Sequence, residues 1–230
     1  MDFIVELEKL NININKDMLN KFELYYNKLI EVNSYMNLTA ITEHDQVYLK
    51  HFYDSLTITK AIKGDNYNIL DVGAGAGFPS VPLAIVKPNI NVTIIDSLNK
   101  RINFLNDLTK YIGIDNVLAI HARAEEFIKN KRESYDYVTA RAVARLNVLA
   151  ELCMPYVKVG GYFIALKGND KEEIDEASNA IKVLGGKIEE IINFNLPDDQ
   201  GERNIVVIKK IKPSLTKYPR IFKTIKDKPL

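Results

Sequence analysis

Three glycines stand at every second position after a short apolar strand, in the stretch NILDVGAGAGFPS at residues 68–80. The strand is predicted over 69–72, and Pro79 suits the first turn of a following helix. A strand, a glycine loop and a helix in succession bring backbone N–H groups close to a nucleotide-like ligand. Glycine serves there because it adopts positive φ and carries no Cβ to block the ligand. The glycines are Gly73, Gly75 and Gly77.

The spacing of these glycines separates two kinds of cofactor site. Dinucleotide-binding loops read G-x-G-x-x-G, whereas this loop reads G-x-G-x-G and follows Asp71. The pattern resembles motif I of the S-adenosylmethionine (SAM) methyltransferases. A tight βα turn in another α/β protein would also fit the loop alone. An NAD-dependent oxidoreductase is disfavoured by the spacing and by the lack of a candidate hydride-transfer acid.

Length and composition indicate an ordinary globular protein. The chain has 230 residues, 47% hydrophobic and 27% charged, with a net charge of +1. No apolar run is long enough to span a membrane, and the amphipathic, acidic MDFIVELEKL is no signal peptide. A single cysteine excludes an intrachain disulfide, and no zinc-ligand spacing is present. We therefore expect a cytoplasmic protein with no metal or membrane partner, and take a monomer as the simplest state.

Residues 1–64 are predicted to form a helical N-terminal extension, because apolar residues recur there at helical spacing with no strand–helix alternation. Thr42 is the expected cap of a second helix that runs through Leu56. Residues 65–212 are predicted to form the cofactor-binding domain, and 213–230 a basic C-terminal tail.

From residue 68 onward strands and helices alternate, which predicts an α/β fold with a mainly parallel, doubly wound sheet. The last two strands are joined by about seven residues, too few for a parallel crossover, so the final strand should run antiparallel. This Rossmann-like, seven-stranded arrangement is the one that class I SAM-dependent methyltransferases show. The expected strands are 68–72, 91–96, 117–122, 135–141, 161–167, 187–196 and 204–211, and the expected helices are 79–86, 98–111, 124–130, 146–157 and 170–184.

Polar residues at strand ends are the candidate cofactor contacts. Asp96 ends the second strand 19 residues after Gly77 and is predicted to bond the ribose hydroxyls, or else to cap the next helix. Ala124 and Glu125 follow the third strand, where the adenine edge is expected; Glu125 could equally be an ordinary first-turn helix charge.

Basic residues are predicted around the same rim. Arg141 ends the fourth strand and could bind the donor's carboxylate or a substrate phosphate, or form an ion pair with a nearby acid. A phosphate-bearing substrate would suit a basic rim. Its other candidate members, each of which could instead be a solvated surface charge, are Arg101, Arg123, Arg145 and Lys167.

Three further features have structural and functional interpretations. His51 and Asp54 lie on one helix face, and we interpret them as a structural pair because no nucleophile accompanies them. Cys153, in an apolar helix, is predicted to be buried. Residues 209–228 carry eight Lys or Arg against one acid, so the tail, with Lys217 and Arg220, could contact RNA or be a solvated, partly disordered terminus.

Nine segments along the chain carry a family resemblance: NLTAIT (37–42), HFYDSL (51–56), ILDVGAGAGFPSVPLAI (69–85), IDSLNKRINFL (95–105), RAEEF (123–127), VTARAVARL (138–146), FIALKG (163–168), GERNIVVIKK (201–210) and KYPR (217–220). Together they resemble the RsmG family, also called GidB. The resemblance covers nearly the whole chain, although the IFKTIKDKPL that follows KYPR departs from the glycine-containing basic stretch of many relatives.

The resemblance implies a SAM-dependent methyltransferase acting on N7 of a guanosine in the decoding-region loop of 16S rRNA, alone or in the small ribosomal subunit. It implies cofactor contacts at Gly73, Phe78, Ala124, Glu125 and Arg141. Guanine N7 has a free lone pair and no proton to lose, so no general base is expected among these residues. Phe78 or Tyr156 is a candidate lip for an unstacked base. The alternative is a non-catalytic RNA-binding module on the same scaffold.

Overall fold

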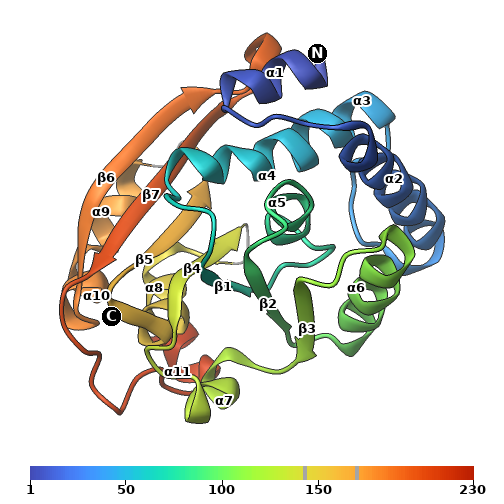
Figure 1. Cartoon of the computed structure of the whole chain (residues 1–230). Coiled ribbons are helices and arrows are strands. Elements are labelled where there is room, and N and C mark those ends of the chain that lie inside the picture. The colour runs from blue at the N-terminus through green and yellow to red at the C-terminus, as the bar shows by residue number, and fades with distance from the viewer. Residues whose placement is uncertain (142–143, 169–170) are drawn as a thin grey trace.

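The computed structural model describes residues 1–141, 144–168 and 171–230, which fold around a seven-stranded sheet (Figure 1). Its strand order is β3-β2-β1-β4-β5-β7-β6. The strands are β1 (Asn68–Val72), β2 (Asn91–Asp96), β3 (Val117–His121), β4 (Tyr135–Arg141), β5 (Val157–Lys167), β6 (Gly186–Asn195) and β7 (Glu202–Lys210).

The directions of the strands confirm the predicted topology. Strands β1 to β5 pair in parallel, and β7 is antiparallel to both β5 and β6. Strand β5 begins earlier than predicted because Val157 pairs with Tyr135 beyond an irregularity in the β4–β5 register. Periodicity does not reveal such an extension, since the added residues, 157–160, include Gly160.

Helices follow the strands close to the predicted ranges. The predicted helix 170–184 is two helices, which break at Ala177, and Asp170 lies outside the described residues. Pro79 is the N-cap of its helix rather than part of the first turn. The helices are α5 (Ser80–Val86), α6 (Asn99–Ile112), α7 (Ala124–Phe127), α8 (Leu146–Cys153), α9 (Lys171–Glu176), α10 (Ser178–Val183) and α11 (Phe222–Asp227).

The N-terminal region is helical, as predicted. The N-cap position of its second helical run is Glu43 and not Thr42, and the Glu43 side chain makes no capping hydrogen bond. The run also contains a π-helical segment that the sequence did not indicate. The elements are α1 (Phe3–Lys9), α2 (Lys16–Met36), α3 (His44–Val47), the π-helix η1 (Tyr48–Tyr53), α4 (Asp54–Leu56) and the 3₁₀ turn η2 (Thr57–Lys60).

Each face of the sheet is covered by its own hydrophobic core. On one face, α2 and η1 pack with α5 and α6 in a cluster that joins Phe22, Tyr25 and Phe52 to Phe78. On the other face, α8, α10 and α11 form the second cluster, which contains the buried Cys153. The N-terminal helices therefore belong to the main core and do not form a separate layer (Figure 1).

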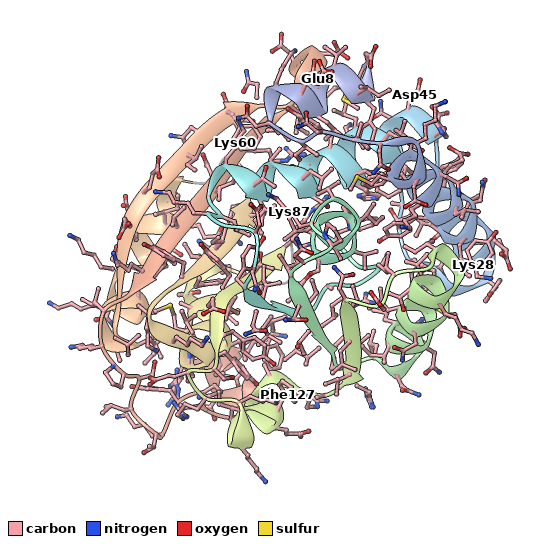
Figure 2. All side chains as sticks on the ribbon, in the orientation of Figure 1. Glu8, Lys28, Asp45, Lys60, Lys87 and Phe127 are labelled. Carbon is pink, nitrogen blue, oxygen red and sulfur yellow. The ribbon has the colours of Figure 1, made fainter. Side chains whose placement is uncertain are left out.

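Charged side chains occupy the outer faces of these layers. Figure 2 shows Glu8, Lys28 and Asp45 on the outer side of the N-terminal helices. Within the described ranges, no helix has the length and apolarity that crossing a bilayer would require.

A buried ion-pair junction joins the extension to the sheet. Asp54, at the start of α4, lies 3.2 Å from Nη2 of Arg141 and 3.1 Å from Nε of Arg203. Arg141 also donates to the carbonyl oxygen of Lys50 at 2.6 Å and to Ser55 Oγ at 2.9 Å. A π-helix often marks a functional position, and here its carbonyl groups are bound to the end of β4.

We predict that Asp54→Asn destabilises the fold by about 3 kcal/mol, because it leaves two buried or half-buried guanidinium groups without their carboxylate. Urea unfolding measures the change. Asp45→Asn is the matched control, since its carboxylate is 92% exposed on the same helical run. Equal unfolding midpoints for the two variants would contradict the assigned role of the junction.

Candidate active site

A cavity of about 490 Å³ opens at the carboxyl ends of the first four parallel strands. This is where ligands bind in doubly wound sheets, and the volume suits a nucleotide-sized molecule. The wall contains the seven residues predicted to contact the cofactor, which are Gly73, Gly75, Phe78, Asp96, Ala124, Glu125 and Arg141. The lining residues are Leu38, Thr39, His51, Val72, Gly73, Ala74, Gly75, Ala76, Phe78, Ile95, Asp96, Ser97, Arg101, Ala122, Arg123, Ala124, Glu125, Arg141, Leu152 and Phe222.

The three glycines of the loop have different structural roles. Gly73 has φ 78° and donates its N–H to the carbonyl oxygen of Ile95 at 2.8 Å. Gly75 has φ 61°, and a Cβ built on it meets nothing within 4 Å, so its open side faces space that a ligand could fill. A Cβ on Gly77 would lie 2.8 Å from Tyr25 Oη, so this glycine is required for packing against α2.

Asp96 lies in the cavity wall with 4% exposure. Its carboxylate accepts from the N–H groups of Leu98, at 2.8 Å, and Gly75, at 3.3 Å, and from Arg101 Nη1 at 3.3 Å. The N-cap of α6 is Leu98, so the alternative N-cap role for Asp96 is wrong. A carboxylate has about four acceptor sites, which leaves room for a hydroxyl. The ribose contact stays a prediction.

Ala124 and Glu125 begin α7 and also line the cavity. The carbonyl oxygen of Ala124 accepts from the hydroxyl of Tyr156, whose side chain is fully buried. Tyr156 therefore holds the backbone of Ala124, and since it does not line the cavity it is not the lip that the sequence suggested. Glu125 Oε1 lies 3.4 Å from the N–H of Phe222, in the C-terminal segment. The predicted adenine contacts of Ala124 and Glu125 stay predictions.

Arg141 lines the cavity, but most of its donors are already engaged. Besides the junction with Asp54, its guanidinium lies 5.7 Å from the centroid of the Phe78 ring, and the side chain is only 15% exposed. The alternative ion pair with a nearby acid is thus present and buried. A contact between Arg141 and the donor's carboxylate stays a prediction, and it would have to share the guanidinium with Asp54.

An aromatic wall faces the cavity beside Arg141. The His51 ring stacks on Phe78 with centroids 4.5 Å apart, and His51 Nε2 lies 2.7 Å from Thr39 Oγ1. His51 and Asp54 both contact Arg141, in keeping with a structural interpretation of the two residues. Burial, helped by the charge of Arg141, lowers the pKa of His51 to about 4. The ring is therefore neutral near pH 7.

The predicted basic rim divides into two groups. Arg101 and Arg123 line the cavity, whereas Arg145 pairs with Glu176 at 2.5 Å and Lys167 with Glu173 at 2.6 Å. In the tail, Lys217 is exposed, with its ammonium 5.2 Å from the Tyr218 ring. Arg220 donates to Glu151 at 2.8 and 2.6 Å, so its guanidinium anchors the tail. RNA contacts by these residues stay predictions.

Asp71, which precedes the glycine loop, is fully buried. One carboxylate oxygen accepts from Ser80 Oγ, and the other has no hydrogen-bond partner among the described residues. Burial raises the pKa of Asp71 to about 8, although the bonds from Ser80 oppose this. The residue ties the end of β1 to the start of α5.

Sequence analysis missed several residues of the cavity wall, among them Leu38, Thr39, Leu152 and Phe222. The first two lie in NLTAIT, which marked the family but indicated no chemistry. Asn33 Oδ1 fixes this loop by accepting from the N–H groups of Leu38 and Thr39 at 2.6 and 2.8 Å. Only folding brings that loop to the strand ends.

The residues present fit SAM. Gly75 leaves open space beside the loop, Asp96 offers a shielded carboxylate, and small or apolar residues such as Val72 and Ala122 line the rest. When bound, SAM supplies an electrophilic methyl group on a sulfonium. Within the described residues, no set of three or more His, Cys, Asp or Glu is arranged to hold a metal.

We predict that two neighbouring glycine substitutions fail in different ways. Gly77→Ala should destabilise the fold by about 2–3 kcal/mol, because its Cβ overlaps Tyr25, Val81 and Leu105. Gly75→Ala should cost only about 1 kcal/mol of stability, from its left-handed backbone, yet weaken SAM binding. Thermal melting and calorimetry with SAM separate the two effects. A reversed pattern would contradict the division of roles.

We also predict a pH dependence of stability that depends on His51. Its folded pKa of about 4 lies below the ordinary 6.5. The unfolded chain therefore binds the proton first, and the free energy of unfolding falls as pH drops from about 6.5 towards 4. The loss approaches about 1.4 kcal/mol per pH unit. His51→Gln should lack this slope in urea unfolding. The raised pKa of Asp71 makes the free energy of unfolding rise as pH drops, but this contribution is the same in wild type and in His51→Gln, so it cancels in the comparison. Parallel curves would contradict the prediction.

Comparisons with known proteins agree with this geometry. Solved structures with the same fold include a SAM-dependent methyltransferase from Aquifex aeolicus, with TM-score 0.56 and 16% identity, covering 75% of this chain and 96% of that one. Another is M. jannaschii TYW2 in complex with AdoMet, with TM-score 0.52 and 18% identity, covering 64% and 69%. These solved structures confirm the predicted class I methyltransferase fold.

Curated relatives are much closer in sequence. Ribosomal RNA small subunit methyltransferase G of Lactobacillus helveticus (strain DPC 4571) is 50% identical, over 99% of this chain and 98% of that protein. The protein of the same name from Bacillus licheniformis is 53% identical, over 95% and 93%. The model of the GidB family, described as rRNA small subunit methyltransferase G, matches residues 18–206. The match covers most of the chain and confirms the predicted family: the chain belongs to the GidB family of SAM-dependent methyltransferases.

Proposed function

We propose that this protein transfers the methyl group of SAM to N7 of a guanosine in the decoding-region loop of 16S rRNA. The observation that carries the proposal is the cofactor-sized cavity, whose glycine loop and Asp96 form one part of the wall and whose His51–Phe78 stack forms another. The family match supports rRNA as the substrate class. It also favours catalysis over the alternative, a non-catalytic RNA-binding module.

The site suits a nucleophile that needs no deprotonation. Guanine N7 attacks the sulfonium methyl with its own lone pair, so positioning and electrostatics are sufficient for catalysis. His51 is neutral near pH 7 and is bonded to Thr39, which suits a wall better than a proton acceptor. Asp71 is buried against Ser80 and does not line the cavity.

The target base would enter unstacked beside the aromatic wall. In this wall Phe78 is stacked on His51, and the stack holds the Phe78 ring in place before the base arrives. Arg101 and Arg123 lie at the cavity and would neutralise phosphates of the flanking nucleotides. In this proposal the protein works as a cytoplasmic monomer. Residues 65–212 bind the cofactor and contribute Phe78 to the aromatic wall, residues 1–64 contribute His51 to that wall, and 213–230 form the tail.

The proposal predicts methyl transfer to small ribosomal subunits or 16S rRNA that lack the modification. Methyl-labelled SAM should give 7-methylguanosine after nuclease digestion, with one methyl group per rRNA. Gly73→Arg is the control that should abolish incorporation, because its side chain would fill the cavity. A wild-type protein that binds SAM but modifies neither substrate would contradict the proposal and favour the binding module.

A further inference from the structure

The C-terminal segment reaches back to the cavity and places an aromatic side chain in its wall. Phe222, the first residue of α11, lines the cavity with Arg123, Ala124 and Glu125. Its N–H lies 3.4 Å from Glu125 Oε1. These are the residues that follow β3, at the end of the cavity where the adenine ring is predicted to lie.

Anchors on both sides hold this segment in place. Before Phe222, Arg220 binds Glu151 through its backbone N–H at 2.9 Å and its guanidinium at 2.8 and 2.6 Å. Glu151 is fully buried in α8, so the anchor is both charged and shielded. Tyr218 is buried, and its carbonyl oxygen accepts from Arg132. After Phe222, Ile225 is fully buried in the second core.

Phe222 itself is left 37% exposed between these anchors. Burial of a large apolar ring is favourable, so a partner that covers the exposed part of this ring would gain binding energy. Here Phe222 borders an open cavity. A purine is a flat, apolar partner that would cover it.

We propose that residues 218–226 form the outer wall of the adenine subsite, with the Phe222 ring packing against the purine of SAM. The proposal rests on SAM occupying the cavity in the orientation predicted above. It gives the C-terminal segment a role in cofactor binding, whereas the basic composition of the segment was interpreted either as an RNA contact or as a solvated terminus.

A second groove beside the cavity supplies a neighbouring residue that does not line the cavity, which allows cofactor binding to be tested separately from an RNA contact. It lies between α7 and α11 and shares Arg123, Glu125 and Phe222 with the cavity. Ile221 and the basic Lys223 and Lys226 line the groove but not the cavity. Phe222 thus stands at the boundary, and Ile221, its 66% exposed neighbour, provides a matched control.

The test measures ligand binding by calorimetry, with SAM and with 5′-methylthioadenosine, which keeps the adenosine but lacks the amino-acid end. Phe222→Ala should weaken both ligands about tenfold, a loss in the range of aromatic stacking on a base. Ile221→Ala should stay within twofold of wild type. The melting temperature without ligand checks that both variants fold.

A fluorescence experiment tests the same contact without removing the ring. The chain contains no tryptophan, so Phe222→Trp introduces a single reporter. Saturating 5′-methylthioadenosine should change its emission, while Ile221→Trp should not respond.

Three outcomes would overturn the inference. These are a Phe222→Ala protein that binds within twofold of wild type, an equal loss for Ile221→Ala, and a tryptophan at 222 that is silent at saturating ligand. Failure of the proposed function looks different, because wild type would then bind SAM and leave rRNA unmethylated.

Discussion

The ion-pair junction of Asp54 with Arg141 and Arg203 is the constraint on which the site depends. It binds the N-terminal helical run to the end of β4 and to β7. Because the run is fixed there, His51 reaches the cavity and stacks on Phe78. Removing a buried carboxylate that pairs with two arginines is strongly destabilising, because the arginine charges are left uncompensated. The extension is thus positioned by charge at one point and by the shared core elsewhere.

The glycine loop also depends on the packing of the N-terminal helices. Gly75 leaves space for the cofactor, whereas Gly77 accommodates Tyr25 of α2, whose hydroxyl donates to the carbonyl oxygen of Ala76 at 2.6 Å. One short motif therefore meets the ligand on one side and the extension on the other. Cofactor site and aromatic wall share this loop, so a change in the packing of α2 is expected to reach the backbone that meets SAM.

In the C-terminal segment, the charge pattern of the sequence did not predict what the basic side chains bind in the fold. Eight basic residues between 209 and 228 suggested a polyanion contact. Yet Arg220 is bound to Glu151, and Lys210 is fully buried, donating to the carbonyl oxygen of Met154 at 2.7 Å and to Ser214 Oγ. Two of the eight charges thus hold the segment in place. Composition does not distinguish an anchoring arginine from a solvated one, because the partner acid lies 69 residues away in sequence.

The sequence by itself determined the alternation of strands and helices, the reversal of β7, the glycine loop and the strand-end position of Asp96. These follow from local periodicity, loop length and backbone preferences, which act over a few residues. Tertiary structure alone decided that Arg141 binds Asp54, that Lys167 and Arg145 form ion pairs, and that Thr39, His51 and Phe222 line the cavity. Those outcomes depend on which distant side chains meet, and burial then fixes whether a charge is paired or free to bind a ligand.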